Sequence, residues 1–240
     1  MSLLSTKELI KSYQSRRVVD RVNMVVEPGE VVGLLGPNGA GKTTTFYMIA
    51  GIIRPDSGRV FFDGIDISGL NMYHRAKLGI GYLPQQPSIF KKLTVEENIL
   101  IILESLKLSK KEKGERLKSL MDYLHLGHLA KHEAWSLSGG ERRRLEITRL
   151  LVTSPKIILL DEPFLGVDPI SVLDVQKIIL KLKKSGLGIL LTDHNVRETL
   201  SITDRTYLLF DGQVMKEGDS AFLSNDPEAK RFYLGENFRL

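Results

Sequence analysis

The sequence predicts an α/β fold with a parallel sheet at its core, and three features of the chain indicate this fold. An apolar run, Val31–Leu35, leads into a glycine-rich loop and then a helix-like stretch at 43–50. Two further runs, 157–160 and 188–191, are wholly apolar, and a helix-like segment at about 171–184 separates them. Strands that are covered by helices on both faces have such continuous apolar sequences. We therefore expect these runs to be buried parallel strands.

Other stretches predict antiparallel strands. The first thirty residues alternate polar and apolar side chains, and a second strand-rich stretch, 58–67, contains the hairpin turn signal Asp63-Gly64. We expect both to be antiparallel strands flanking the strand at 31–35. A third hairpin is predicted at 207–210 and 213–216, with its turn at Asp211-Gly212.

The middle of the chain has helical periodicity instead. The segment 94–153 opens with Thr94-Val95-Glu96-Glu97, in which Thr94 and Glu97 form a capping-box sequence. Leucines then recur at helical spacing, at Leu100, Leu103, Leu117, Leu120 and Leu124. This pattern predicts a mostly helical insertion. A further helix is predicted at 142–153, where Pro155 follows its end.

Composition limits the class of protein. A length of 240 residues fits one large or two small domains, and the 42% of hydrophobic residues are enough to build a buried core. The absence of cysteine excludes a disulfide framework and a thiolate zinc site. Lys7 and Glu8 stand where a signal peptide needs apolar residues, and no apolar run approaches the roughly 20 residues of a membrane span. We expect a cytoplasmic protein. A net charge of +5 permits an anionic partner, but the densest basic segment, 107–118, also holds two glutamates, so we expect no nucleic-acid partner.

A phosphate-binding loop, G-x-x-x-x-G-K-S/T, follows the first apolar run. It consists of Gly36, Pro37, Asn38, Gly39, Ala40, Gly41, Lys42 and Thr43, and Thr44 comes next. Glycines allow the backbone to form a concave nest of N–H donors, and the start of the following helix adds the positive end of its dipole. Lys42 would then reach the β- and γ-phosphates, and the Thr43 hydroxyl would bind Mg²⁺. The sequence therefore predicts binding of ATP or a related nucleotide.

Two adjacent carboxylates, Asp161 and Glu162, end the apolar run at 157–160. Ligands of α/β sheets bind at this carboxyl end of the strands. Asp161 is a candidate Mg²⁺ ligand, and Glu162 a candidate catalytic residue that orients the water attacking the γ-phosphate. On its own the pattern also fits a buried strand that ends in acidic turn residues.

The segment Leu137-Ser138-Gly139-Gly140-Glu141 precedes the helix predicted at 142–153. Ser138 and Glu141 fit a capping box, and a helix start with exposed glycines is also an anion site. The segment resembles the signature motif of ATP-binding cassette (ABC) ATPases, with Glu141 in place of the usual glutamine. The resemblance implies a P-loop NTPase fold of the ABC type, ATP and Mg²⁺ as cofactors, and hydrolysis of ATP.

Further residues follow the order of the ABC pattern. Tyr13 matches the aromatic that stacks on adenine, and Asp168 matches the D-loop aspartate. Gln85 matches the Q-loop glutamine, a candidate catalytic residue and Mg²⁺ ligand, and His194 matches the catalytic switch histidine that contacts the γ-phosphate. Taken singly, Tyr13 also fits a packed strand aromatic, Gln85 a loop amide and His194 a surface histidine near a helix start. In this family the signature of one subunit, here Ser138 to Glu141, closes over the phosphate loop of another. The resemblance therefore implies a homodimer with two sites.

The ABC resemblance also implies a division of the single nucleotide-binding domain, 1–240. The catalytic core with its antiparallel strands would comprise 1–87 and 154–218, and the helical subdomain would comprise 88–153. A C-terminal tail would comprise 219–240. In the family, membrane subunits dock near the Q-loop, here at about 85–93, where Phe90 is a candidate contact or an ordinary core residue.

Several stretches resemble the ATPase of the lipopolysaccharide export system. They are 44–48, 81–85, 161–164, 166–172, 192–199 and 233–240. Leu165, usually a small residue, and Gln86, usually acidic, depart from that pattern. The resemblance implies that two copies work with two integral membrane subunits on the cytoplasmic face of the inner membrane, where the partners handle lipopolysaccharide.

Two alternatives remain at this point. A branched-chain amino acid importer ATPase shares the short cassette and a similar tail. The stretches 167–171 and 193–197 favour the exporter. A soluble ATP-dependent regulator or nucleic-acid factor would need no membrane partner, but the chain has none of the second cassettes, coiled coils or zinc modules that non-transport ABC ATPases carry.

Overall fold

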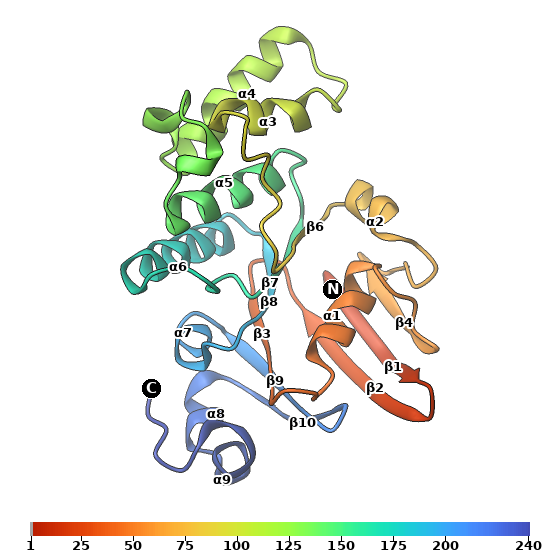
Figure 1. Ribbon diagram of the computed structural model, residues 1–240. Helices are drawn as coiled ribbons and strands as arrows, with labels where there is room; N and C mark the ends of the chain where they lie inside the picture. The colour runs from red at the N-terminus through yellow and green to blue at the C-terminus, as the bar shows by residue number, and fades with distance from the viewer. Residues whose placement is uncertain (1) are drawn as a thin grey trace.

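The structure, a computed structural model, describes residues 2–240 as two β-sheets with helices packed around them (Figure 1). Met1, which the predicted domain 1–240 includes, lies outside the described residues. The larger sheet has six strands in the order β10-β9-β3-β8-β7-β6. These strands are β3 (Val31–Leu35), β6 (Ile80–Leu83), β7 (Ile157–Asp161), β8 (Gly188–Thr192), β9 (Arg205–Phe210) and β10 (Gln213–Gly218). Each pair of neighbours is parallel except β9 and β10.

The three apolar runs are adjacent in this sheet as β3, β8 and β7, and every residue of these strands is buried. This confirms the prediction of buried parallel strands. The C-terminal hairpin is confirmed as β9 and β10, paired from Phe210 to Gln213 outward. Asp211 and Gly212 form its turn with φ values of 46° and 80°, as a turn with left-handed residues requires.

The smaller sheet is antiparallel and has the strand order β2-β1-β4-β5. Its strands are β1 (Leu4–Tyr13), β2 (Arg16–Val26), β4 (Ser57–Phe62) and β5 (Ile65–Asp66). The predicted antiparallel strands and the turn at Asp63-Gly64 are therefore confirmed. These strands form a sheet of their own, so the prediction that they flank the strand at 31–35 is wrong. The two neighbours of β3 are instead the parallel strands β8 and β9. Helix α1 (Lys42–Ala50) packs between the two sheets, where Phe46 and Ile49 share a buried cluster with Val22 and Leu159.

The segment predicted to be helical contains α3 (Val95–Leu103), α4 (Lys110–Tyr123), two 3₁₀ turns (Gly127–Leu129 and Ala134–Ser136) and α5 (Gly139–Leu151). In Figure 1 these helices lie on the opposite side of the larger sheet's β6–β7 region from the antiparallel sheet. The capping box at Thr94 is confirmed, and all five predicted leucines pack in one apolar cluster with Leu145 of α5.

Two helices begin earlier than the periodicity predicts. Helix α5 starts at Gly139 rather than 142, because Ser138 is its N-cap residue. Helix α6 (Pro169–Lys184) starts two residues before the predicted 171, because Asp168 caps it and Pro169 occupies its first turn. Both differences have one cause: the capping side chain, not the first periodic apolar residue, fixes the start of the helix.

The remaining helices are α2 (Met72–Leu78), α7 (Val196–Leu200), α8 (Ser220–Asn225), α9 (Pro227–Ala229) and a π-helical turn (Lys230–Leu234). The C-terminal segment lies beside α7 in Figure 1, and its Leu223, Tyr233 and Phe238 share an apolar cluster with Leu200 and Leu35. Within residues 2–240, no helix has the length and apolar character to cross a membrane.

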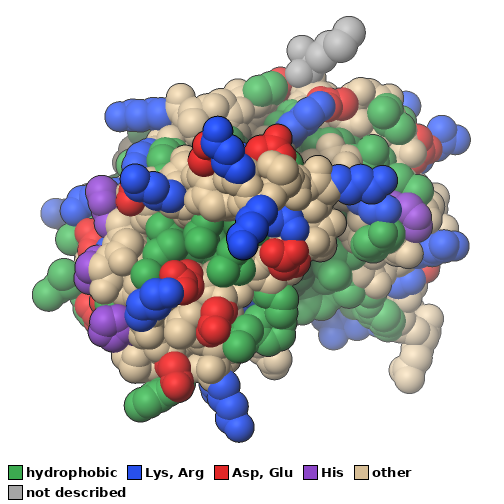
Figure 2. Space-filling model, turned by 90° about the horizontal axis from the view of Figure 1, so that it is seen from above, with side chains coloured by type: hydrophobic (Ala, Val, Ile, Leu, Met, Phe, Trp, Pro, Cys, Tyr) green, Lys and Arg blue, Asp and Glu red, His purple; other side chains and the backbone are tan. Residues whose placement is uncertain are grey.

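Charges of both signs are interspersed on the surface of the helical segment. Lys113 pairs with Glu104, and Lys131 pairs with Glu96. Figure 2, seen from above the view of Figure 1, shows basic side chains with acidic ones between them. The basic residues of this face are therefore distributed as on an ordinary solvated surface.

Candidate functional site

The loop between β3 and α1 has a backbone that two of its glycines make possible. Gly36 has a φ of 151°, and a Cβ there would lie 2.2 Å from the carbonyl oxygen of Leu209. Gly41 has a φ of 95°, and a Cβ there would lie 2.4 Å from the carbonyl oxygen of Val18. Any other residue at these positions would collide with neighbouring backbone, so the loop conformation depends on both glycines.

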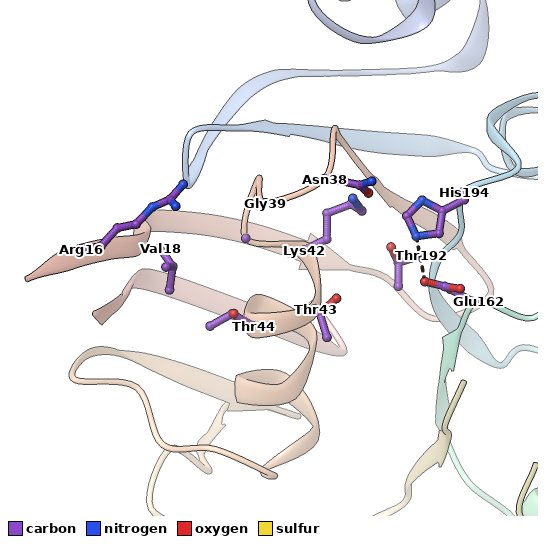
Figure 3. A pocket seen from close by; sticks show the side chains of 11 residues that line it. Arg16, Val18, Asn38, Gly39, Lys42, Thr43, Thr44, Glu162, Thr192 and His194 are labelled. Carbon is purple, nitrogen blue, oxygen red and sulfur yellow. Dashed lines mark ion pairs between the residues drawn. The ribbon is translucent and has the colours of Figure 1, made fainter. Parts of the chain in front are cut away.

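Lys42 begins α1, and its side chain folds back over the loop. The Nζ amine donates hydrogen bonds to the carbonyl oxygens of Gly36, at 2.7 Å, and Pro37, at 3.0 Å. Burial lowers the pKa of Lys42, and the nearby Glu162 carboxylate opposes that shift. In Figure 3 the side chain extends toward Asn38. A buried cation held against the loop is suited to bind a polyanion.

A cavity of about 250 Å³ opens at the N-terminus of α1 (Figure 3). Its lining consists of Arg16, Val18, Asn38, Gly39, Gly41, Lys42, Thr43, Thr44, Glu162, Thr192 and His194. The first backbone N–H groups of a helix have no intrahelical partner, so those at the start of α1 are available to an anion here. The cavity thus has hydrogen-bond donors on one side and the carboxylate of Glu162 on the other.

Glu162 follows β7, and its two carboxylate oxygens have different partners. His194 Nε2 lies 3.0 Å from Oε1, and the Gln85 amide donates to Oε2 at 2.9 Å. Figure 3 shows the contact between Glu162 and His194 at the edge of the cavity. The structure therefore brings the three predicted catalytic residues together, although they come from the ends of three different strands, β6, β7 and β8.

Asp161 is the last residue of β7 and is only 3% exposed. Burial raises the pKa of its carboxyl to about 6; a hydrogen bond from Tyr82 Oη, at 3.3 Å, opposes the shift, and Glu162 and Asp193 add to it. The raised pKa means that the ionised, buried carboxylate is unfavourable. A bound cation would offset this cost, because it stabilises the ionised form.

The predicted Mg²⁺ ligands are Thr43, Gln85 and Asp161. Within residues 2–240 no group of three or more acidic or histidine side chains could hold a metal ion by itself. Mg²⁺ is commonly held by one or two carboxylates together with substrate phosphates, and it prefers oxygen ligands. The buried Asp161 carboxylate and the Thr43 hydroxyl at the cavity fit an ion shared with a nucleotide.

The residues that resemble the signature motif lie apart from this cavity. Ser138 Oγ accepts the Glu141 N–H at 3.3 Å, and Glu141 Oε2 accepts the Ser138 N–H at 2.9 Å, so the two residues cap α5. Gly140 is packed so closely that a Cβ would lie 2.6 Å from Ser171 Oγ on α6. Asp168 Oδ1 accepts the Ser171 N–H at 3.0 Å and caps α6.

The predicted site residues therefore fall into two groups within one chain. Of the residues that the structure describes, neither Tyr13 nor the segment 138–141 nor Asp168 lines the cavity at α1. Gly139 instead borders a second cavity of about 240 Å³, together with Gln85. Tyr13 is 49% exposed at the end of β1, and Lys11 Nζ lies 5.8 Å from the centroid of its ring.

Known proteins similar to this chain match it along its whole length. Residues 19–165 match the ABC transporter family. A lipopolysaccharide export system ATP-binding protein of Escherichia coli K12 is 52% identical over 241 residues, which cover 100% of both chains. The chain belongs to the ABC transporter family. Like other ATP-binding proteins of that family, it binds and hydrolyses ATP.

Solved structures of ABC cassettes have the same fold. One, an ATP-binding cassette of an ABC transporter in its ADP conformation, has a TM-score of 0.88 and 32% identity, with 98% of this chain and 100% of that chain covered. Another, a dimeric cassette in a post-hydrolysis state bound to ADP and Pi, has a TM-score of 0.78 and 27% identity, with 90% and 98% covered. The predicted fold class is confirmed.

Three cavity residues of this ABC cassette were not predicted from the sequence. Arg16 and Val18 come from β2, and Thr192 is the last residue of β8. Thr192 had a usable signal, because it ends an apolar run as Asp161 does, at the ligand-binding edge of the sheet. Arg16 and Val18 had none, because only the position of the antiparallel sheet beside α1 brings them to the cavity.

Proposed function

We propose that this chain is the ATP-hydrolysing subunit that powers the extraction of lipopolysaccharide from the inner membrane and its export to the outer membrane. The observation that carries the proposal is the 52% identity over the full length to an ATP-binding protein of a lipopolysaccharide export system. The alternative, an amino acid importer ATPase, is not favoured by these relatives.

Within one chain, the residues that line the cavity at α1 and those beside it have distinct roles in this proposal. Lys42 and the N–H groups at the start of α1 bind the phosphates of ATP. Glu162 orients and polarises the attacking water, and Gln85 and His194 hold its two carboxylate oxygens in place. Thr43, Gln85 and Asp161 would hold Mg²⁺, which neutralises phosphate charge. Phosphoryl transfer depends mainly on such positioning and charge stabilisation.

The second group of residues acts on the nucleotide of another copy in this proposal. The segment Ser138 to Glu141 forms a helix start outside its own chain's cavity, where Ser138 is exposed, Gly139 and Glu141 are partly exposed and Gly140 is buried against Ser171. Asp168 caps the neighbouring helix α6 through the N–H of the same Ser171. A second copy in the opposite orientation would bring them to the phosphate loop of the first. Tyr13, exposed at the end of β1, would stack on the adenine. The dimeric cassette bound to ADP and Pi supports this arrangement.

Mechanical work on a membrane lipid requires partners that enter the membrane. We therefore assign two integral membrane subunits to the complex, which places this chain at the cytoplasmic face of the inner membrane. Phe90 is 45% exposed, and its ring lies 5.1 Å from the Arg149 guanidinium. This exposure favours a contact for the partners over core packing. The helical segment 88–153 would transmit the movement to the core, 1–87 and 154–218, with the tail 219–240 packed against it.

The test is to purify the chain with its partners from gently solubilised membranes and reconstitute the complex in vesicles. The proposal predicts two integral membrane subunits, and an ATPase rate that changes when lipopolysaccharide is included in the vesicles. Vesicles of the same phospholipids without lipopolysaccharide are the control. Partners that include a periplasmic amino acid receptor, with a rate that lipopolysaccharide does not change, would identify an importer instead.

A further inference from the structure

A buried ion pair on α5 lies between the catalytic carboxylate and the loop after β6. Arg143 Nη1 and Glu146 Oε2 are 3.0 Å apart, and the two side chains are only 5% and 3% exposed. Such a pair contributes little net stability, because both charges lose their hydration. Its position one turn into the helix that Ser138 caps suggests that it serves the geometry of the site.

The guanidinium of Arg143 also contacts the backbone of Glu162. Its Nη2 donates to the Glu162 carbonyl oxygen at 3.1 Å. Glu162 has a left-handed φ of 49°, a conformation that is unfavourable for a residue with a Cβ. The Glu162 N–H donates to Thr192 O at 2.7 Å, and its carbonyl also accepts the Leu165 N–H at 3.2 Å. Arg143 thus ties this unfavourable backbone to α5.

Glu146 contacts the loop that carries Gln85. Its second oxygen, Oε1, accepts the Ser88 N–H at 3.3 Å, and the Ser88 carbonyl accepts a hydrogen bond from Arg149. Ser88 is three residues after Gln85, whose amide reaches the Glu162 carboxylate. The contacts therefore form a closed ring from α5 to Ser88, along the loop to Gln85, across to Glu162 and back to Arg143.

We infer that Arg143 and Glu146 are a positioning pair, which fixes the direction of the Glu162 carboxylate and passes movements of α5 to it. The inference rests on the proposed role of Glu162 in ATP hydrolysis. Neither residue of the pair is among the described residues that line the cavity at α1. The pair therefore acts through Glu162, and its loss lowers kcat without weakening ATP binding.

The test replaces both charges in the full-length chain, with Arg143→Met and Glu146→Leu together. We expect kcat for ATP hydrolysis to fall roughly 10- to 100-fold, because a misplacement of about 1 Å in a catalytic group has effects of this size. KM for ATP and the melting temperature stay near their wild-type values, since apolar residues of similar volume replace buried ion pairs without loss of stability.

The matched control is the exposed pair Asp174 and Lys177 on α6, which has the same i,i+3 spacing and an O–N distance of 3.3 Å. The double variant Asp174→Leu, Lys177→Met also removes one acidic and one basic side chain, but at a site that does not contact Glu162. Its kcat stays at the wild-type value. If the buried double variant fails to fold, Arg143→Lys keeps the charge but loses the planar fork, and its kcat falls less.

A second background separates positioning from general damage. In a Glu162→Gln chain, the double replacement at Arg143 and Glu146 leaves the residual single-turnover rate unchanged, because the residue through which the pair acts is already altered. An equal loss of rate in both backgrounds, or a wild-type kcat in the double variant, would overturn the inference. Near-normal hydrolysis by Glu162→Gln alone would contradict the proposed role of Glu162 instead.

Discussion

The phosphate loop and the signature segment are both glycine-containing turns that begin a helix, but their surroundings differ. The phosphate loop follows a buried strand, folds a lysine back over itself and lines a cavity. The signature segment is capped by its own Ser138 and Glu141 and lies outside that cavity, and the buried cation of its helix, Arg143, is bound to Glu146 and to the Glu162 carbonyl. This difference supports the proposal, in which the phosphate loop binds nucleotide within its own chain and the signature segment acts on the nucleotide of a second copy.

The pKa values of the carboxyl groups in the two regions are shifted in opposite directions. Burial raises the pKa of Asp161 to about 6, so the phosphate-loop region carries an unfavourable charge at neutral pH. The Ser138 backbone N–H lowers the pKa of Glu141, so the charge of the signature region is already satisfied. A bound cation would therefore stabilise the ionised carboxylate of Asp161, whereas the ionised carboxylate of Glu141 is already stabilised without one.

The largest effect is expected for Glu162→Gln. The amide keeps the size of the side chain but cannot polarise water as a carboxylate does, so kcat falls roughly 1,000-fold, within the range for loss of a general base. ATP binding is retained, and the two regions stay closed on each other as an ATP-bound dimer. Single-turnover kinetics and light scattering with ATP measure both effects. A variant that hydrolyses ATP at a near-normal rate would remove Glu162 from this role.

Lys42→Ala tests whether the phosphate-loop region is sufficient for nucleotide binding. Loss of a buried charge-assisted contact to phosphate weakens ATP affinity roughly 100-fold, by the usual energy of such bonds. Titration with a fluorescent ATP analogue measures the change. Lys177→Ala, which removes an exposed lysine paired with Asp174, is the control and keeps wild-type affinity. Unchanged affinity in Lys42→Ala would contradict the assignment of this loop.

Ser138→Ala tests the signature region, and the chain offers a matched control. Ser109 caps α4 with Glu112 in the same way that Ser138 caps α5 with Glu141. Each serine to alanine change costs about 1 kcal/mol of stability through loss of the cap. Only Ser138→Ala also lowers the ATPase rate, roughly tenfold, because it removes the contact that the proposed dimer gives Ser138 with the phosphate of the other copy. Equal rates in the two variants would mean that Ser138 is no more than a helix cap.

The sequence correctly predicted the elements whose local pattern is typical of a single structure. Apolar runs predicted the parallel strands, and two Asp-Gly pairs predicted hairpins, because these patterns depend on neighbouring residues alone. The start of α5 was placed three residues late, although the capping box of Ser138 and Glu141 already marked it. The sequence could not show which sheet an antiparallel strand joins. Alternation of polar and apolar residues identifies the buried face of a strand, but not the strand that pairs with it.

Contacts between distant segments were beyond the sequence. Motif order identified Gln85, Glu162 and His194 as candidates, but their contacts depend on three strand ends meeting at one edge. Arg143 donates to a carbonyl nineteen residues away, and Arg16 reaches the cavity from another sheet. These positions follow from packing, so no local pattern could supply them.

The smallest effect is the pH dependence of stability that Asp161 introduces. Its folded pKa, about 6, is above the ordinary 3.8, so folding takes up a proton between these values. The stability lost by ionising the buried Asp161 is zero below pH 3.8, grows as the pH rises and is complete above pH 6. Asp161→Asn is therefore more stable than wild type at pH 7.5, by about 1–2 kcal/mol after allowance for solvent near the cavity.

Urea unfolding of wild type and Asp161→Asn between pH 4 and 7.5 measures this difference, which should shrink toward zero at the acid end. Glu141→Gln sharpens the comparison, because the pKa of Glu141 is lowered on folding. Wild type should therefore be more stable than Glu141→Gln at neutral pH, and should lose that advantage as the pH falls through the folded pKa. If both variants showed the same pH trend, the electrostatic distinction between the two regions would be wrong, because opposite shifts require opposite slopes.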